Sequence, residues 1–134
     1  MPKLLVLTDD PAIARTVLES MDIPKLYIMD EEMVRTSTGM TMDPSDPEYR
    51  PRMIQKIGAL TRAFSAKRPL ATVVDMRSQD AVDLVPHDAS ILIYDGSKAR
   101  KLFYNVKYKT TFTIQGPKDK KSMDMVQKAI QSIS

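Results

Sequence analysis

The feature that most constrains the fold of this chain is an alternation between short apolar runs and longer segments with helical periodicity. The apolar runs are too short for buried helices and are typical of strands. Polar turn residues follow each run, and apolar residues then recur at steps of three and four, which predicts amphipathic helices. The repeated strand–helix order predicts an α/β fold with a mostly parallel sheet.

We expect strands at Leu4–Thr8, Lys25–Met29, Ala71–Val74, Ser90–Tyr94 and Tyr108–Ile114. We expect helices after Pro11, over Tyr49–Phe64, Gln79–Val85 and Lys98–Tyr104, and after Pro117. Five strands joined through helices predict a three-layer sandwich with a doubly wound, Rossmann-like sheet. The expected strand order is 2-1-3-4-5, the order of flavodoxin-like folds. The last strand alternates in polarity, which is typical of an edge.

The 134 residues have the usual length of one domain, so we expect a single α/β domain over 1–134. Residues 31–48 break the periodic pattern with prolines, a glycine and hydroxyl side chains, which predicts an inserted flexible loop with at most a turn of helix at its start. No apolar run approaches the ~20 residues that cross a bilayer. The first apolar segment is too short for a signal peptide. We therefore expect a cytoplasmic protein without membrane contact.

Aspartates follow four of the five expected strands, at Asp9-Asp10, Asp30, Asp75 and Asp95. Because the carboxyl ends of parallel strands share one edge of a sheet, Asp9, Asp10 and Asp75 are expected to converge. The chain has no cysteine and one histidine, so a metal would be held by oxygens, which favours Mg²⁺. The alternative is that these residues cap helices and start turns, as Asp10 before Pro11 would.

The segment from Leu4 to Ala14, with its apolar strand and acid pair, resembles the opening of a response-regulator receiver domain. Asp75, after a third apolar strand, matches the aspartate that receivers phosphorylate. The resemblance implies that Asp9 and Asp10 hold Mg²⁺ with Asp75. It also implies that Asp75 accepts phosphate and that Ser97 supplies the hydroxyl after strand four.

Receivers carry Lys-Pro after strand five, whereas this chain reads Gln115-Gly116-Pro117. The missing lysine removes the charge that orients a phosphoryl group. The resemblance therefore implies a receiver-like module of signal transduction or protein interaction, which either is phosphorylated at Asp75 or works through protein contacts without phosphorylation. Its partner would bind on the last strand and helix. Catalysis is not required by this interpretation, and the sequence does not decide whether the protein is an enzyme.

The charge of the chain supports a second hypothesis. The net charge is +3, and segment 98–121 holds eight basic residues against the single acid Asp119. The basic candidates in the first part of this segment are Lys98, Arg100, Lys101, Lys107 and Lys109. Such a segment attracts polyanions, so a magnesium-dependent nuclease-like or nucleic-acid-binding domain is one alternative. A structural or assembly component without catalytic activity is another, because a common fold does not imply a function.

Overall fold

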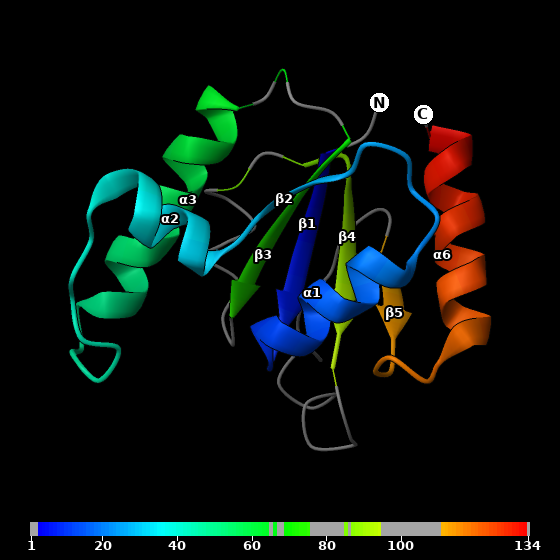
Figure 1. Ribbon diagram of the computed structural model, residues 1–134, viewed down its shortest axis with the longest axis horizontal. Coiled ribbons are helices and arrows are strands. Elements are labelled where there is room, and N and C mark those ends of the chain that lie inside the picture. The colour runs from blue at the N-terminus through cyan, green and yellow to red at the C-terminus, as the bar shows by residue number, and fades with distance from the viewer. Residues whose placement is uncertain are drawn as a thin grey trace.

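The computed structural model describes residues 3–64, 66, 69–75, 85, 87–94 and 111–133, with the backbone alone at 75, 111 and 133. Its strands are β1 (Lys3–Thr8), β2 (Tyr27–Met29), β3 (Leu70–Asp75), β4 (Ala89–Ile93) and β5 (Thr111–Ile114). They form one five-stranded sheet in which every neighbouring pair is parallel. The predicted α/β class with a parallel sheet is confirmed (Figure 1).

The strand order corrects the prediction: it is β2-β3-β1-β4-β5, so β1 and β3 exchange places relative to the expected 2-1-3-4-5 order. Both strands are almost wholly apolar and buried on both faces, so the sequence holds nothing that ranks one as more central. The exchange keeps β1 and β3 adjacent, with Thr8 opposite Asp75. The predicted edge position of β5 is confirmed.

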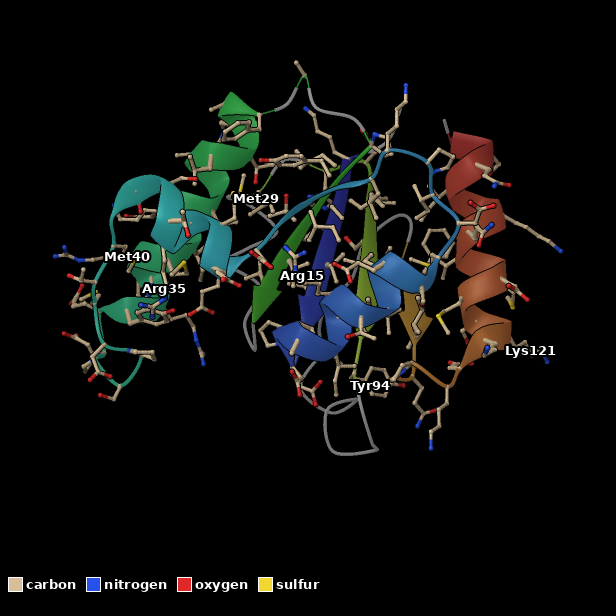
Figure 2. The ribbon with its side chains drawn as sticks, in the orientation of Figure 1. Arg15, Met29, Arg35, Met40, Tyr94 and Lys121 are labelled. Carbon is tan, nitrogen blue, oxygen red and sulfur yellow. The ribbon has the colours of Figure 1, made fainter. Side chains whose placement is uncertain are left out.

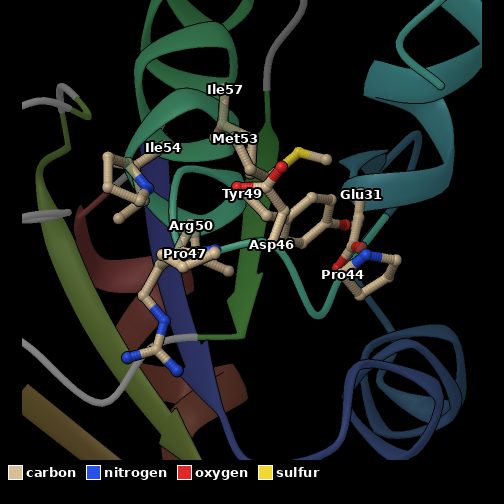
Figure 3. A pocket seen from close by; sticks show the side chains of 11 residues that line it. Glu31, Pro44, Asp46, Pro47, Tyr49, Arg50, Met53, Ile54 and Ile57 are labelled. Carbon is tan, nitrogen blue, oxygen red and sulfur yellow. The ribbon is translucent and has the colours of Figure 1, made fainter. Parts of the chain in front are cut away.

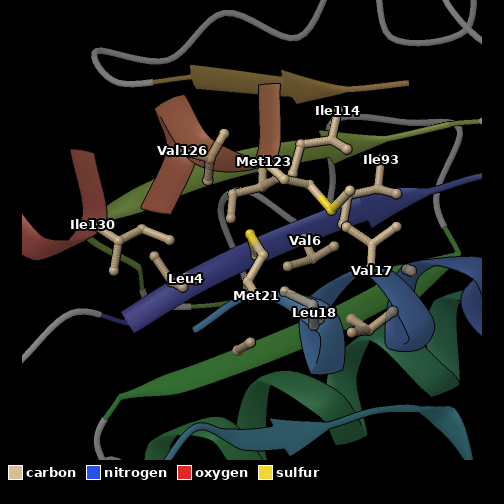
Figure 4. Packing of buried hydrophobic residues seen from close by; sticks show 14 of the residues in the cluster. Leu4, Val6, Val17, Leu18, Met21, Ile93, Ile114, Met123, Val126 and Ile130 are labelled. Carbon is tan, nitrogen blue, oxygen red and sulfur yellow. The ribbon is translucent and has the colours of Figure 1, made fainter. Parts of the chain in front are cut away.

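Helices cover both faces of the sheet. On one face lie α1 (Pro11–Ser20) and α6 (Lys120–Ile133), and on the other lie α2 (Glu31–Thr38) and α3 (Tyr49–Ala63). Alternation along the strands divides the core accordingly, because successive side chains point to opposite faces. Leu4 and Val6 of β1 pack with α1 and α6 (Figure 4), whereas Leu5 and Leu7 pack with α3.

Helix α2 corrects the prediction that residues 31–48 form a loop, since only residues 39–48 are irregular. Asp30 caps the helix by accepting the Met33 N–H, and Gly39 ends it in the left-handed conformation at φ 70°. Inside the helix, the hydroxyls of Thr36 and Thr38 donate to carbonyls one turn earlier. Hydroxyl residues are ambiguous in a sequence because the same side-chain bonds also occur in turns.

Several other predictions differ at their boundaries or lie beyond what is described. Strand β2 begins at Tyr27 because Lys25 adopts a left-handed turn conformation with φ 58°. The helices expected at Gln79–Val85 and Lys98–Tyr104 and the start of the strand expected at Tyr108 fall outside the described residues, apart from Val85. Within the described part of the chain, no helix is long and apolar enough to cross a bilayer.

The start of α6 gives a pH-dependent prediction. Asp119 accepts the N–H groups of Gln115 at 2.9 Å and Ser122 at 3.2 Å, and these bonds, that from Gln115 first, lower the pKa of its carboxyl. A lowered folded-state pKa stabilises the protein above the ordinary carboxyl range and ceases to do so as the pH falls through the folded pKa. We expect Asp119→Ala to lower the free energy of unfolding by about 1 kcal/mol at neutral pH.

Below about pH 4 the difference between Asp119→Ala and the wild type should shrink. Urea unfolding at neutral and acidic pH measures it. Asp124→Ala, at an exposed position of the same helix, is the matched control and should change stability by less than about 0.5 kcal/mol. A loss at Asp119 that does not change with pH would contradict the assignment.

Candidate functional site

The carboxyl ends of β1 and β3 mark the edge of the sheet where a ligand is expected. The chain leaves β1 toward β2, whereas it leaves β3 in the opposite direction to reach β4 beyond β1. Ligands of doubly wound sheets bind outside the carboxyl ends of strands at such a reversal. Thr8 and Asp75 are register partners here, so the backbone places Asp9 one residue past the strand that adjoins Asp75.

Asp10 caps α1, as the capping interpretation predicts. Its Oδ1 accepts the N–H groups of Ala12 at 3.0 Å and Ile13 at 3.3 Å. The buried hydroxyl of Thr8 fixes the turn, because it accepts the Asp10 N–H and donates to the Asp10 carbonyl, each at 3.0 Å. The carboxylate therefore occupies the helix N–H groups that would otherwise bind an anion.

Asp9 is in a different environment. Its Oδ1 is shut off from solvent and has no hydrogen-bond partner in the described part of the chain. The other buried side-chain atom without a partner among the described residues is the neutral Ser90 Oγ on β4. Asp9 as a residue is half-buried, so this is one shielded oxygen of a partly exposed carboxylate, and a shielded acceptor without a donor is unfavourable. A hard cation at this oxygen would offset that cost.

The predicted metal site is described only in part. Asp9 and Asp10 are adjacent at the end of β1, but the side chain of Asp75 is outside the described residues. Among the side chains that are described, no group of three or more carboxylates and histidines is close enough to hold a metal ion. Ser97 and the basic candidates Lys98, Arg100, Lys101, Lys107 and Lys109 also lie outside the described residues. The site at Asp9, Asp10 and Asp75 remains a prediction.

A cavity of about 480 Å³, here called the edge pocket, opens beside the end of β3. Its floor is apolar and is formed by Met53, Ile54, Ile57 and Val74. Its rim carries the charged residues Glu31, Asp46 and Arg50. Figure 3 shows Arg50 and Pro47 on the side of the pocket opposite Glu31 and Pro44. The volume is within the range of small-molecule sites.

Arg35 of α2 contacts two residues that line the edge pocket, Tyr49 and Glu31. Its Nη2 donates to the Tyr49 hydroxyl at 3.0 Å and to the Met42 carbonyl at 3.4 Å. Its guanidinium carbon lies 5.2 Å from the centre of the Tyr49 ring. Its Nη2 also forms an ion pair with Glu31 Oε1 at 3.7 Å. One side chain thus joins α2, the 39–48 loop and the start of α3. Figure 2 shows Arg35 beside α2 and α3.

A second charged contact joins α1 to α2. Arg15 donates through Nε to Asp30 Oδ2 at 2.9 Å, and its Nη2 forms an ion pair with the same oxygen at 2.9 Å. Its Nη1 donates to Glu19 at 3.0 Å. The hydrogen bond to Asp30 raises the pKa of Arg15. Asp30 is 8% exposed and also caps α2. Its role is therefore structural, which agrees with the capping interpretation of the aspartates that follow strands.

Sequence reasoning missed the edge pocket. The available signal was the pair of Asp-Pro steps at 43–44 and 46–47 directly before an amphipathic helix. Such steps favour turns, and a turn leading into a helix at a sheet edge is a common position for a binding loop. The tie between Arg35 and Tyr49 had no comparable signal, because it joins two elements that are 14 residues apart in sequence.

Comparison with known proteins bears on the fold. No family model and no curated protein sequence matches this chain. The structure of the Deinococcus radiodurans tunicamycin resistance protein is similar, with a TM-score of 0.64 at 11% identity over 98% of this chain and 96% of that one. A de novo designed protein with a P-loop NTPase fold has a TM-score of 0.48 at 8% identity over 99% and 94%. The likeness to the first of these shows that this chain has an established α/β fold.

Proposed function

We propose that this chain is a receiver-like protein-interaction module of signal transduction that works without phosphorylation. In this proposal it binds Mg²⁺ at the carboxyl ends of β1 and β3, where Asp9, Asp10 and Asp75 follow the strands or end them and which is here called the acidic edge. The observation that carries the proposal is the solvent-shielded Asp9 Oδ1 without a partner among the described residues, one residue past the register partner of Asp75. A divalent cation at this oxygen would supply the partner that Asp9 Oδ1 lacks in the described part of the chain.

The proposal rests on the acidic edge and not on topology, since the strand order departs from the one that the receiver resemblance implies. Two observations support independence from phosphorylation. Asp10 occupies the N–H groups at the start of α1. Gln115, at the position of the receiver lysine, is exposed and uses its N–H to bond Asp119. A phosphorylated Asp75 would lack the balancing charge that the lysine supplies in receivers.

The partner surface in this proposal is the outer side of α6, the last helix. Met125 on this helix is 63% exposed and is the large hydrophobic residue that stands out on the described surface. Lys121 and Lys128 lie one turn to either side of it in sequence and are also exposed. In this proposal Met125 is buried by the partner and the two lysines lie at the polar rim of the interface.

Magnesium-dependent stability tests the proposal. A ligand at ten times its dissociation constant stabilises by about 1.4 kcal/mol, which for a chain of this size corresponds to about 4 °C in Tm. We expect millimolar Mg²⁺ to raise Tm by this order and Asp9→Asn to abolish the rise. Because the Asp9 side chain forms no hydrogen bond within the described part of the chain, Asp9→Asn breaks none there, and the variant in EDTA should be about as stable as the wild type.

Asp22→Asn is the matched control, because it removes one negative charge at an exposed position beyond the other end of α1. It should retain the full magnesium effect. A Tm that does not respond to Mg²⁺, or a response that Asp9→Asn leaves intact, would refute the proposal. A nuclease-like domain and a structural component remain alternatives, the first expected to show metal-dependent cleavage of nucleic acid and the second no response to Mg²⁺.

A further inference from the structure

Helix α3 carries charges of a single sign. Its 15 residues include Arg50, Arg52, Lys56 and Arg62 and no aspartate or glutamate. Within the described part of the chain, none of these four cations forms an ion pair with a carboxylate. The basic side chains of α1 and α2, Arg15 and Arg35, are both paired. The surplus of positive charge on α3 is therefore not accounted for by the contacts that hold the fold.

Three of these cations share the outer side of the helix, here called the α3 face: Arg52, Lys56 and Arg62. Arg52 and Arg62 are exposed and Lys56 is half-buried, whereas Met53, Ile57 and Thr61 point into the core. A rise of 1.5 Å per residue separates Arg52 from Lys56 by about 6 Å and from Arg62 by about 15 Å along the axis. The exposed residues Gln55 and Ala59 lie between them, and the exposed Ala63 follows Arg62.

The composition of the α3 face selects among anionic partners. A protein interface needs a buried apolar or aromatic centre, whereas the exposed apolar side chains of α3 are the small ones of Pro51, Ala59 and Ala63. A membrane-binding helix inserts its apolar side, but the apolar side of α3 is packed in the core. Phosphate contacts need no apolar centre, because they gain affinity from cations that release counterions. A nucleic-acid backbone is the partner that fits this surface best.

The neighbouring charges orient such a partner. Asp43, Asp46 and Glu48, all exposed, precede the first turn of α3. These exposed carboxylates are ionised at neutral pH, and hydrogen bonds from Ser45 lower the pKa of Asp43 further. These acids repel phosphate from the beginning of the helix, where Arg50 lies at the rim of the edge pocket. The strand is therefore expected to run from Arg52, one turn beyond Glu48, over Lys56 to Arg62.

We propose that the α3 face binds the sugar–phosphate backbone of a nucleic acid without sequence specificity. The surface differs from segment 98–121 and from the acidic edge, so the proposal does not depend on Mg²⁺ binding. Three phosphate contacts would give log Kobs a slope of about −2 against the logarithm of the salt concentration for a single strand. Removing two of the three cations should reduce the slope and the affinity together.

The test is fluorescence anisotropy of a labelled oligothymidylate of about 20 nucleotides with the full chain in low salt and EDTA. Arg52→Glu/Lys56→Glu is compared with Lys120→Glu/Lys121→Glu, which reverses two charges at the start of α6. Figure 1 shows α3 and α6 at opposite ends of the molecule. We expect the first variant to bind at least about tenfold more weakly and the second within about twofold of the wild type.

Three outcomes would overturn the proposal: no binding in low salt, equal losses in the two variants, or a loss only in the α6 variant. The last outcome would assign binding to the basic segment 98–121.

Arg52→Gln/Lys56→Gln removes the same two charges without introducing acids, so it should also weaken binding if the charge-reversed variant fails to fold, and circular dichroism verifies the fold of each variant. Asp46→Asn/Glu48→Gln should tighten binding. A polyglutamate chain that binds as tightly, with the same loss in Arg52→Glu/Lys56→Glu, would replace nucleic acid by an acidic protein as the partner.

Discussion

We expect Asp30→Ala to lower the free energy of unfolding by about 2 kcal/mol, a loss at least as large as that expected at Arg35 or Asp119. Loss of the cap on α2 costs about 1 kcal/mol. Loss of the hydrogen bond and ion pair with Arg15 adds about 1 kcal/mol. Such charged contacts are strong, but Arg15 is 40% exposed and solvent screens the interaction in part. Equilibrium unfolding in urea measures the sum.

Two companion variants separate the contributions at Asp30. Asp30→Asn retains an oxygen for the Met33 N–H but loses the negative charge, so it should recover about half of the loss. Glu19→Ala removes the other, exposed partner of Arg15 and should cost less than about 0.5 kcal/mol. If Asp30→Ala were no worse than Glu19→Ala, Asp30 would not be the residue that connects α1 to α2.

The second large effect is expected at Arg35. Arg35→Ala removes the hydrogen bonds to Tyr49 and Met42 together with the contact over the Tyr49 ring, so we expect a loss of about 1–2 kcal/mol. Because the contact closes the wall of the edge pocket, amide hydrogen exchange over residues 40–48 should accelerate more than that of β1.

A double-mutant cycle with Tyr49→Phe isolates the bond to the hydroxyl and should give a coupling of about 1 kcal/mol. Arg62→Ala, which removes an exposed arginine without an ion pair among the described residues, is the control and should change stability by less than about 0.5 kcal/mol. Additive effects of Arg35→Ala and Tyr49→Phe on the free energy of unfolding would contradict a stabilising hydrogen bond between Arg35 and the Tyr49 hydroxyl.

The architecture followed from the sequence where one signal dominated. Leu4–Thr8 and Ala71–Val74 are apolar on both faces, so they could be placed inside a parallel sheet. The relative order of β1 and β3 in the sheet could not be predicted, because the two strands are equally apolar. Their order depends on how the helices between the strands pack. Helix α2 was missed beyond its first turn because Thr36 and Thr38 satisfy their hydroxyls inside the helix instead of breaking it.

The candidate site could likewise be predicted only in part. Capping by Asp10 could be predicted, since aspartate followed by proline is a local signal for the start of a helix. The environment of Asp9 could not, because adjacent aspartates look alike in sequence and only packing shields one oxygen. The edge pocket likewise depends on contacts between α2 and α3 that no local pattern encodes.

A cation site at the acidic edge can be located by adding Mn²⁺ to the ¹⁵N-labelled chain and following its amide signals by NMR. We expect the signals of Thr8, Asp9, Asp10 and Val74 to broaden first and to recover when excess Mg²⁺ displaces the paramagnetic ion. The signals of α6 should be unaffected at the same Mn²⁺ concentration. Broadening that begins at the acidic residues of the 39–48 loop, or that is uniform over the acidic surface, would contradict the site.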